Sequence, residues 1–307
     1  MSPVKFLLYS LPIIAFIVVF TSRELHRGAL GSADNPIKLY FAPSVDAQTI
    51  TTTGDALTSY LLKETGLHFR TAIPSNYIAI VEAIGSNKCD IAIVNTFTYL
   101  LANQKYGATA RLRVIRDDGE TTYRGQFVTS VNSGINTIED LAGKKIAYTD
   151  PASTSGYILP KALLKAKNIK PAQEVFAAKH DNVITMVYQG QVDAGATYYS
   201  PPAADGTLRD ARIRVITQFP DVAQKIKIIG FTEQIPNDPI IFNKALPRSI
   251  QNKIVEALLK FVDTKDGQEA LYSIYSVRGL VATKDEDFDV LRDLLKRIDV
   301  DIEGSVK

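Results

Sequence analysis

The sequence predicts an α/β protein of two lobes, each with a mixed, mostly parallel sheet flanked by helices, joined by two hinge crossings. The first observation is that short apolar runs alternate with amphipathic segments from Ile37 onward. The second is that the polar stretch 116–125 interrupts this alternation, which then starts again. The third is the length of 307 residues, which suits about two domains.

The first half of the chain alternates strand and helix patterns. Apolar runs predict strands over 37–43, 67–73 and 89–96, and amphipathic patterns predict helices over 54–66 and 76–88. In the second helix one face carries apolar side chains at i, i+3, i+4 and i+7, namely Tyr77, Ile80, Val81 and Ile84. Gly66 and Gly85 stand where these helices should end. Such an alternation is typical of βαβ units.

The second half repeats the pattern. Its predicted strands are 126–132, 144–150, 174–179, 192–198, 213–219 and 225–233, and its main predicted helices are 157–169 and 182–191. After "IPNDPIIF" at 235–242 the chain is expected to be largely helical. Pro247 suits a helix start, and "DEDFDVLRDLLKRI" places acids in the first turn and bases in the last.

The order of these elements predicts where the lobes divide. We expect residues 36–124 to form the first part of lobe 1, 125–234 to form lobe 2, and 235–307 to return to lobe 1. The chain then crosses between the lobes near Tyr123 and near Gln234, a topology that permits hinge closure. Ligands in open α/β sheets bind beyond the carboxyl ends of strands, here 94–98, 149–156 and 197–200.

Composition and the amino terminus limit the possible functions. The 35 basic and 33 acidic side chains nearly balance, which argues against nucleic acid as the main partner. Residues 6–20 form an apolar run of about 15 residues behind Lys5, so segment 1–35 is predicted to be a signal peptide or an uncleaved membrane anchor. The lone Cys89 has no partner for an intramolecular disulfide and is expected to be a small buried apolar residue.

The stretch "TDPASTSGYILP" at 149–160 predicts an anion site. A strand, a hydroxyl-rich loop and a helix starting near Gly156 follow one another. The first turn of a helix has unpaired N–H groups and a partial positive charge, and hydroxyls add donors without adding charge. The alternative is an ordinary N-cap with the other hydroxyls solvated. The loop has neither the Gly-Lys-Ser/Thr ending of a P-loop nor the spaced glycines of a dinucleotide site.

Several segments, in order, resemble one family. They are "YIAIVEAI", "CDIAIVNTFTYLLA", "TIEDLAGKKIAYTDP", "DPASTSGYILP", "KHDNVITMVYQGQVDAGATY", "IPNDPIIF" and "RGLVATKDEDFDVLRDL". The chain is similar over 37–300 to the periplasmic substrate-binding components of ABC transporters for phosphate, phosphite and phosphonates. The resemblance implies a periplasmic-binding-protein fold and capture of a small phosphorus oxyanion between the lobes. It also implies delivery to a membrane permease, on the periplasmic or extracellular face of the cytoplasmic membrane.

Carried over by position, the resemblance places oxyanion contacts on three loop residues and one histidine: Ser153, Thr154, Ser155 and His180. His180 can donate a hydrogen bond and, near pH 6.5, add a charge. From its residue type alone it would be a surface histidine at a strand end.

The same resemblance places an acidic contact on Asp238 and an aromatic wall on Tyr123. A carboxylate accepts a hydrogen bond from a protonated ligand oxygen or pairs with a ligand amine. Without the resemblance, Asp238 would be a turn residue and Tyr123 a packing residue. Thr96, after a predicted strand, is a further candidate hydroxyl donor. Asp90 and Asp193 each precede a strand and are predicted to be structural.

Other classes of protein stay open as alternatives. A tethered sensory domain would have the same two lobes. An enzyme is disfavoured because the sequence has no nucleophile–base pair and no metal-ligand spacing, with His26, His68 and His180 scattered. A sugar or peptide binder is disfavoured because Trp is absent. We expect no cofactor, no metal and a monomer, while segments 41–57 and 197–206 leave the particular anion open.

Overall fold

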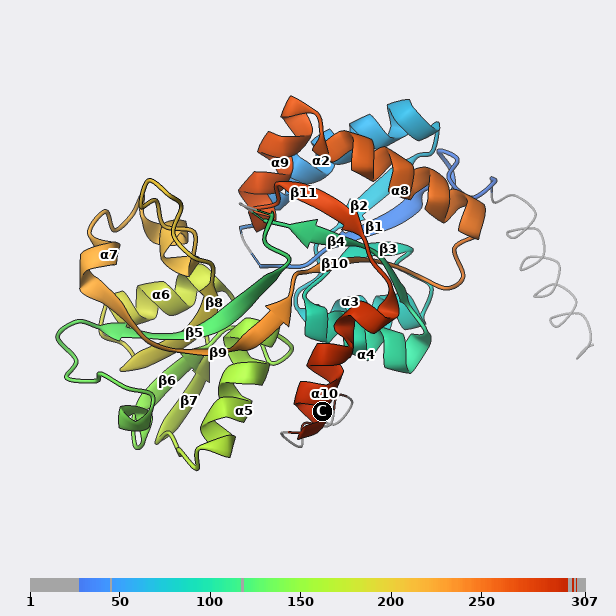
Figure 1. Ribbon diagram of the computed structural model, residues 1–307. Helices are drawn as coiled ribbons and strands as arrows, with labels where there is room; N and C mark the ends of the chain where they lie inside the picture. The colour runs from blue at the N-terminus through green and yellow to red at the C-terminus, as the bar shows by residue number, and fades with distance from the viewer. Residues whose placement is uncertain (1–27, 45, 117–118, 298–299, 301, 303–307) are drawn as a thin grey trace, which may run out of the picture.

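The computed structural model describes residues 28–44, 46–116, 119–297, 300 and 302, and most of the predicted signal or anchor segment lies outside them. The described residues form two lobes, each built on one sheet (Figure 1). The strand orders are β11-β4-β10-β3-β1-β2 and β7-β6-β8-β5-β9. No helix within these residues is long and apolar enough to cross a membrane.

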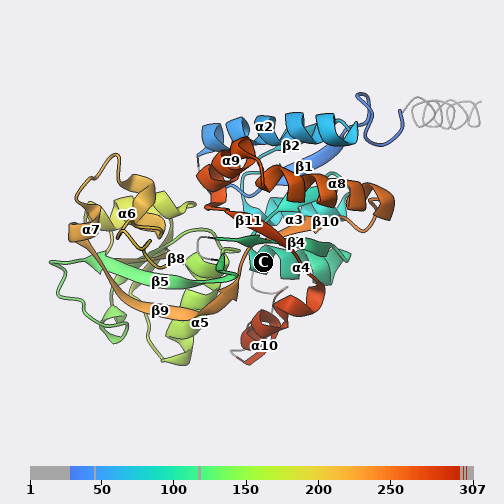
Figure 2. The same ribbon diagram turned by 45° about the horizontal axis from the view of Figure 1, so that its top comes forward.

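The larger lobe carries the six-stranded sheet. Its strands are β1 (Ile37–Phe41), β2 (Phe69–Ala72), β3 (Ile91–Ile93), β4 (Thr109–Ile115), β10 (Pro239–Phe242) and β11 (Gly279–Ala282). Its helices are α2 (Ala47–Thr65), α3 (Tyr77–Gly85), α4 (Thr96–Tyr106), α8 (Arg248–Val262), α9 (Lys265–Tyr275), η5 (Asp285–Phe288) and α10 (Asp289–Arg297). Helices α2, α8 and α9 cover one face of the sheet and α3 and α4 the other, in both views (Figures 1 and 2).

The smaller lobe carries the five-stranded sheet. Its strands are β5 (Thr122–Ser130), β6 (Lys145–Tyr148), β7 (Gln173–Phe176), β8 (Ala194–Tyr199) and β9 (Ile226–Pro236). Its helical segments are η2 (Glu139–Leu141), η3 (Thr154–Ile158), α5 (Leu159–Ala166), α6 (His180–Tyr188), η4 (Ala211–Val215) and α7 (Val222–Lys225). Apolar residues of α5 pack on one face, and those of α6 and α7 on the other.

Two connections join the sheets in the described part of the chain, from β4 to β5 and from β9 to β10, as the fold prediction required. Parallel pairing is confined to β2-β1-β3 and β7-β6-β8. The remaining pairings are antiparallel, so the parallel share is smaller than predicted. The lobe boundaries at 124/125 and 234/235 stay a prediction.

One predicted strand is wrong, and three strands, β4, β10 and β11, were missed. Residues 213–219 were expected to form a strand, but the 3-10 helix η4 begins this segment. The reason is Arg212, whose buried guanidinium bonds Asp210 at 2.7 Å and the carbonyl of Ile226 at 3.0 Å, which holds the segment against β9. Strands β4 and β11 pair with each other, and neither was predicted.

Helix and core predictions agree with the structure. The predicted apolar face of α3, from Tyr77 to Ile84, is buried. Gly66 ends α2 in the left-handed conformation, with φ of 68°. Helix α10 has Asp289 in its first turn and Lys296 and Arg297 in its last. Cys89 is fully buried, as expected, and burial raises the pKa of its thiol.

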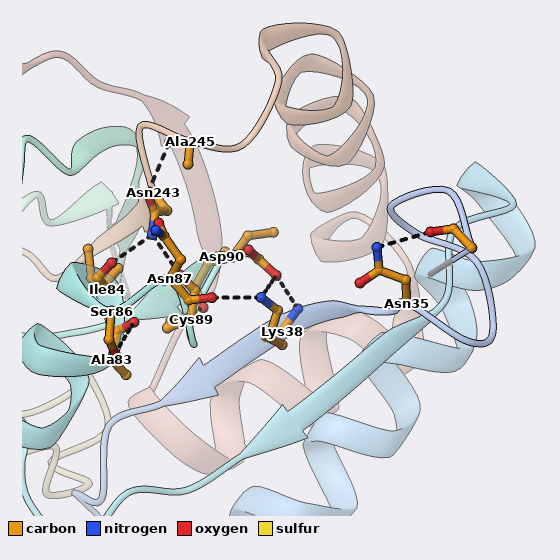
Figure 3. A network of polar contacts seen from close by, with 12 residues as sticks. Asn35, Lys38, Ala83, Ile84, Ser86, Asn87, Cys89, Asp90, Asn243 and Ala245 are labelled. Atoms are coloured by element: carbon orange, nitrogen blue, oxygen red, sulfur yellow. Dashed lines mark hydrogen bonds and ion pairs between the residues drawn. The ribbon is translucent and has the colours of Figure 1, made fainter. Parts of the chain in front are cut away.

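Asp90 and Asp193 hold equivalent strands at equivalent places. The Asp90 carboxylate accepts the N–H of Lys38, where β1 starts, at 2.8 Å (Figure 3). The Asp193 carboxylate accepts the N–H of Lys145, where β6 starts, also at 2.8 Å. Figure 3 also shows Asn243 tying the loop after β10 to the carbonyls of Ile84 and Cys89. The structural role predicted for both aspartates is confirmed.

Candidate functional site

A cavity of about 60 Å³ lies where the two lobes meet. A single water needs about 10–15 Å³ on the same measure, so the cavity holds a group of a few heavy atoms. Its lining residues Asn95, Ser153 and Ser200 lie in the loops that follow strands β3, β6 and β8. The strand ends predicted from the sequence are therefore the ones that meet.

The loop after β6 is fixed by its own hydrogen bonds. The Ser153 hydroxyl caps the helical segment by accepting the N–H of Gly156 at 3.1 Å. A Cβ on Gly156 would lie 2.1 Å from Oγ1 of Thr149, so only glycine fits there. Gly125 on β5 is equally constrained, because a Cβ would lie 2.8 Å from the Ser155 carbonyl. The helical segment starts at Thr154, two residues before the predicted start.

The structure brings five of the seven predicted site residues to the cavity. They are Tyr123, Ser153, Ser155, His180 and Asp238. Each is less than one-tenth exposed, apart from Asp238, which is partly buried. Ligand contact by these five side chains stays a prediction. The alternative of an N-cap also holds for Ser153, because the same hydroxyl caps the helical segment and lines the cavity.

Thr154 and Thr96 are not brought to the cavity, contrary to the prediction. The Thr154 hydroxyl donates to Oδ1 of Asn95 at 2.9 Å and accepts the N–H of Phe97 at 2.9 Å. The Thr96 hydroxyl donates to the carbonyl of Pro236 at 2.7 Å. Because each hydroxyl has one proton, and each proton already has a protein acceptor, neither side chain is a donor for a ligand.

Asn95 ties the two lobes together beside the cavity. Its Oδ1 accepts the Thr154 hydroxyl and also caps α4 through the N–H of Thr98 at 3.0 Å. Its Nδ2 donates to the carbonyl of Ala152 at 3.2 Å. Two buried hydrogen bonds of one side chain therefore connect the loop after β3 with the loop after β6, and a third caps α4.

His180 is a buried, neutral donor. Its Nδ1 lies 2.7 Å from Oγ1 of Thr197. Burial, reinforced by the charges of Arg214 and Arg116, lowers the pKa of His180 to about 3. His180 is therefore neutral near pH 6.5 in the ligand-free pocket, and a charge on it with an anion bound stays a prediction. When Thr197 donates to Nδ1, the proton lies on Nε2 and is available to an acceptor.

Only one of the two carboxylate oxygens of Asp238 has a hydrogen-bond partner among the described residues. Its Oδ2 pairs with Nη2 of Arg116 at 3.0 Å, and Nη1 of the same guanidinium donates to Asn237 at 2.7 Å. That guanidinium lies 4.7 Å from the ring centroid of Tyr123. Among the described residues Oδ1 of Asp238 has no hydrogen-bond partner. Burial raises the pKa of Asp238, and Arg116 and, more weakly, the nearby Tyr123 hydroxyl oppose that shift.

Three arginines line the cavity and were missed by the sequence reasoning: Arg116, Arg209 and Arg214. Arg209 pairs with Glu120 at 3.2 Å, and Arg116 pairs with Asp238. The wrong strand prediction over 213–219 hid Arg214, because a strand pattern gives no reason to place it at a cleft. The polar stretch after β4 was the available signal for Arg116.

Arg214 spans the two lobes. Its Nε donates to the Tyr198 hydroxyl at 3.1 Å. Its two Nη atoms donate to the carbonyls of Ser273 and Ile274 at 3.1 and 3.0 Å, at the carboxyl end of α9. A cation suits a helix carboxyl end, so the smaller lobe completes a helix of the larger one.

Metal chemistry has no support in the described part of the chain. No group of three or more His, Cys, Asp or Glu side chains there is placed to hold a metal ion. What the arrangement offers chemically is a set of hydrogen-bond donors, guanidinium groups and one open carboxylate oxygen.

Comparisons with known proteins agree with this geometry. Residues 39–288 match the family model described as ABC transporter, phosphonate, periplasmic substrate-binding protein. The chain is 25% identical over 292 residues to the phosphate-import protein PhnD of Mycolicibacterium smegmatis, covering 88% of this chain and 87% of that protein. It is 25% identical over 216 residues to the phosphonates-binding periplasmic protein of Escherichia coli, covering 68% of this chain and 61% of that protein.

Solved structures show the same fold. A binding protein component of an ABC phosphonate transporter from Pseudomonas aeruginosa superposes with a TM-score of 0.75 at 19% identity, covering 86% of this chain and 88% of that chain. PhnD1 of Prochlorococcus marinus, in complex with methylphosphonate, gives a TM-score of 0.71 at 15% identity, covering 86% and 98%.

Fold and cleft together define a two-lobed substrate-binding protein of an ABC transporter. Within that class, the chain belongs to the phosphonate periplasmic substrate-binding family, because the family model spans most of its length. It acts on the periplasmic side of the cytoplasmic membrane. The relatives are transport components, which disfavours the sensory alternative.

Proposed function

We propose that the cavity binds a small phosphorus oxyanion, such as a phosphonate, phosphite or phosphate, and that the protein presents it to an ABC permease as a monomer. One observation carries the proposal. The helical segment from Thr154 starts at the cavity wall, and the same cavity is lined by Asp238, whose Oδ1 has no hydrogen-bond partner among the described residues.

Donors from the smaller lobe would hold the oxyanion. Free N–H groups at the helix start attract negative charge, and the Ser153 and Ser155 hydroxyls add donors. A neutral His180 would donate from Nε2, and an anion beside it would oppose the forces that lower its pKa. The ligand would thus be gripped by hydrogen bonds, with guanidinium groups behind them.

Asp238 would favour a ligand that carries a proton on one of its oxygens. Leaving Oδ1 buried without a donor is costly, so a ligand oxygen that brings a proton is favoured over one that does not. Hydrogen phosphate, phosphite and alkylphosphonates can bring such a proton. Sulfate at neutral pH cannot.

The proposed function includes closure of the two lobes around the ligand and release of the ligand without chemical change. The lobes would close about the crossings from β4 to β5 and from β9 to β10, with boundaries near 124 and 234. The bound anion would leave unchanged, since no nucleophile with an adjacent base lines the described cavity. Phosphorus NMR of the ligand recovered after incubation tests the second point, and any new phosphorus species would contradict it.

Calorimetry of the purified protein tests the binding proposal. We expect methylphosphonate, phosphite or phosphate to bind at least ten-fold more tightly than sulfate. Asp238→Asn should narrow that ratio, because an amide can donate to sulfate. Asp205→Asn, at an exposed loop position, is the matched control and should leave it unchanged. Sulfate binding as tight as that of the best phosphorus ligand would overturn the role of Asp238, and absence of binding by all three would overturn the function.

A further inference from the structure

The charged residues around the cavity are mostly positive. Among the described residues that line it, Arg116, Arg209 and Arg214 are basic and Asp238 is the single acid. His180 adds no negative charge in either protonation state. The wall of the cavity therefore presents three guanidinium groups and one carboxylate, while Glu120 pairs with Arg209 from outside the lining.

The one lining carboxylate is already shared. Oδ2 of Asp238 bonds the Arg116 guanidinium at 3.0 Å, which leaves only Oδ1 open. An ammonium group has three donors and a full positive charge, and it would have to compete with Arg116 for this carboxylate. A neutral P–OH group needs a single acceptor, which Oδ1 provides.

Arg214 lines the cavity without an ion-pair contact among the described residues, and the negative charge of Asp181 acts on its guanidinium from outside the cavity lining. Its three hydrogen bonds go to neutral oxygens, those of Tyr198, Ser273 and Ile274. None of the ion pairs recorded for the described residues involves it. These bonds fix the guanidinium in place, and two of its five N–H groups remain for a ligand or water.

The three arginines line the same cavity that would hold the ligand, so a bound ligand lies close to their charges. A substituent on phosphorus held in this cavity lies beside guanidinium groups, because all three arginines line it. Inside a protein, like charges at such separations repel far more strongly than in water. A positive substituent would meet that repulsion near each of the three arginines, and Asp238 is the one lining carboxylate that could offset it.

We infer that this site selects compact phosphorus oxyanions whose substituent carries no positive charge, and that it rejects aminoalkylphosphonates. Arg214 is the residue that sets this specificity. Arg116 contributes because it already pairs with Asp238, so an amine would have to compete for that carboxylate. The inference rests on the proposed function and narrows it to phosphite, phosphate and short alkylphosphonates.

A size-matched ligand pair tests the inference. Ethylphosphonate and aminomethylphosphonate have the same number of heavy atoms and differ in an ammonium group. Calorimetry at neutral pH should show ethylphosphonate binding at least ten-fold more tightly. Methylphosphonate, phosphite and phosphate are measured alongside to establish that the protein binds phosphorus oxyanions.

Variants of Arg214 test whether the preference for ethylphosphonate over aminomethylphosphonate depends on the charge of this side chain. Arg214→Met removes the charge and should reduce the preference at least three-fold, whereas Arg214→Lys should keep it. Arg70→Met, at an exposed arginine on β2, is the control and should change nothing. Thermal unfolding of each variant verifies that it is folded, and the wild-type ligand pair decides the matter if Arg214→Met does not fold.

Each contrary outcome has its own meaning. Equal binding of the pair, or a preference for aminomethylphosphonate, overturns the inference and leaves the proposed function standing. Failure of both ligands while methylphosphonate binds also overturns it, because size and not charge would then exclude them. Failure of every phosphorus ligand overturns the proposed function and the inference with it.

Discussion

The two lobes contain the same βαβ unit and use its first helix start differently. In the larger lobe β1, α2, β2, α3 and β3 follow one another, and in the smaller lobe β6, η3 with α5, β7, α6 and β8 do so. Both units have the strand order 2-1-3 in their own numbering. Asp90 and Asp193 brace the first strand of each unit at the same distance.

The difference lies in the capping residue of the first helix. Asp46 caps α2, and its carboxylate accepts both the hydroxyl and the N–H of Thr49 at 2.6 and 2.8 Å. These hydrogen bonds lower the pKa of Asp46, which keeps it negative. The equivalent cap in the smaller lobe is the neutral Ser153. One helix start thus carries its own anion, and the other has room for an external one.

A negatively charged cap in the smaller lobe should remove this difference between the two helix starts. In Ser153→Asp a carboxylate replaces the hydroxyl at the cavity, so we expect at least a 100-fold loss of methylphosphonate affinity, or about 2.7 kcal/mol. Helix capping should survive, because Asp caps as well as Ser. Calorimetry measures the affinity and thermal unfolding measures the fold.

Two matched variants sharpen that result. Ser153→Asn keeps the cap without a charge and should bind far better than Ser153→Asp. Asp46→Ser makes the opposite exchange in the larger lobe and should leave affinity unchanged. Equal affinities for the Asp and Asn variants would show that charge at this helix start does not matter.

The second comparison is between two asparagine caps of the larger lobe, one of which reaches across. Asn95 caps α4 and also binds Thr154 and Ala152 of the other lobe, whereas Asn76 caps α3 with a single bond to Ala79. Asn95→Ala should cost about 3 kcal/mol of unfolding free energy, because it also leaves buried groups unpaired. Asn76→Ala should cost about 1 kcal/mol.

Denaturant unfolding of both variants measures these costs. A loss for Asn95→Ala no larger than that for Asn76→Ala would mean that the cross-lobe bonds add no stability.

The third comparison concerns the first residues of α3 and α6, Tyr77 and His180, which both line the cavity. The pKa of His180 falls from 6.5 to about 3 on folding. The folded state therefore resists protonation, so its stability is complete above pH 6.5 and declines as the pH falls toward 3. The slope is at most about 1.4 kcal/mol per pH unit for one proton.

Unfolding of the ligand-free protein between pH 7 and 5 tests this slope. His180→Gln should flatten it, and Tyr77→Phe should retain it. A slope that is the same in wild type and His180→Gln would contradict a neutral, buried histidine.

Much of the fold could be predicted from the sequence, because the repeating pattern of apolar residues records which face of each helix is buried. The face from Tyr77 to Ile84 is an example. Residues 213–219 failed because their apolar pattern suits a strand, and the pairing of Arg212 with Asp210 overrides it. Such a tertiary contact leaves no periodic signal.

The site was predictable where its residues follow strands and not where they come from distant contacts. Ser153 and Ser155 lie in a loop that follows a predicted strand, whereas His180 and Asp238 were predicted only through the family resemblance. Thr154 looks the same as its neighbours in sequence, yet its hydroxyl faces Asn95 of the other lobe. Packing decides which side chains of a loop point into the cavity. Packing also brings Arg116, Arg209 and Arg214 to the cavity.

The burial of Cys89 gives the protein an internal reporter. A thiol sealed in the core, with a raised pKa, is protected from oxidation and from alkylating reagents in an oxidising compartment. Labelling of this one sulfur therefore counts only the moments when the core of the larger lobe opens. Its rate under native conditions measures how often that core opens, with no probe added to the chain.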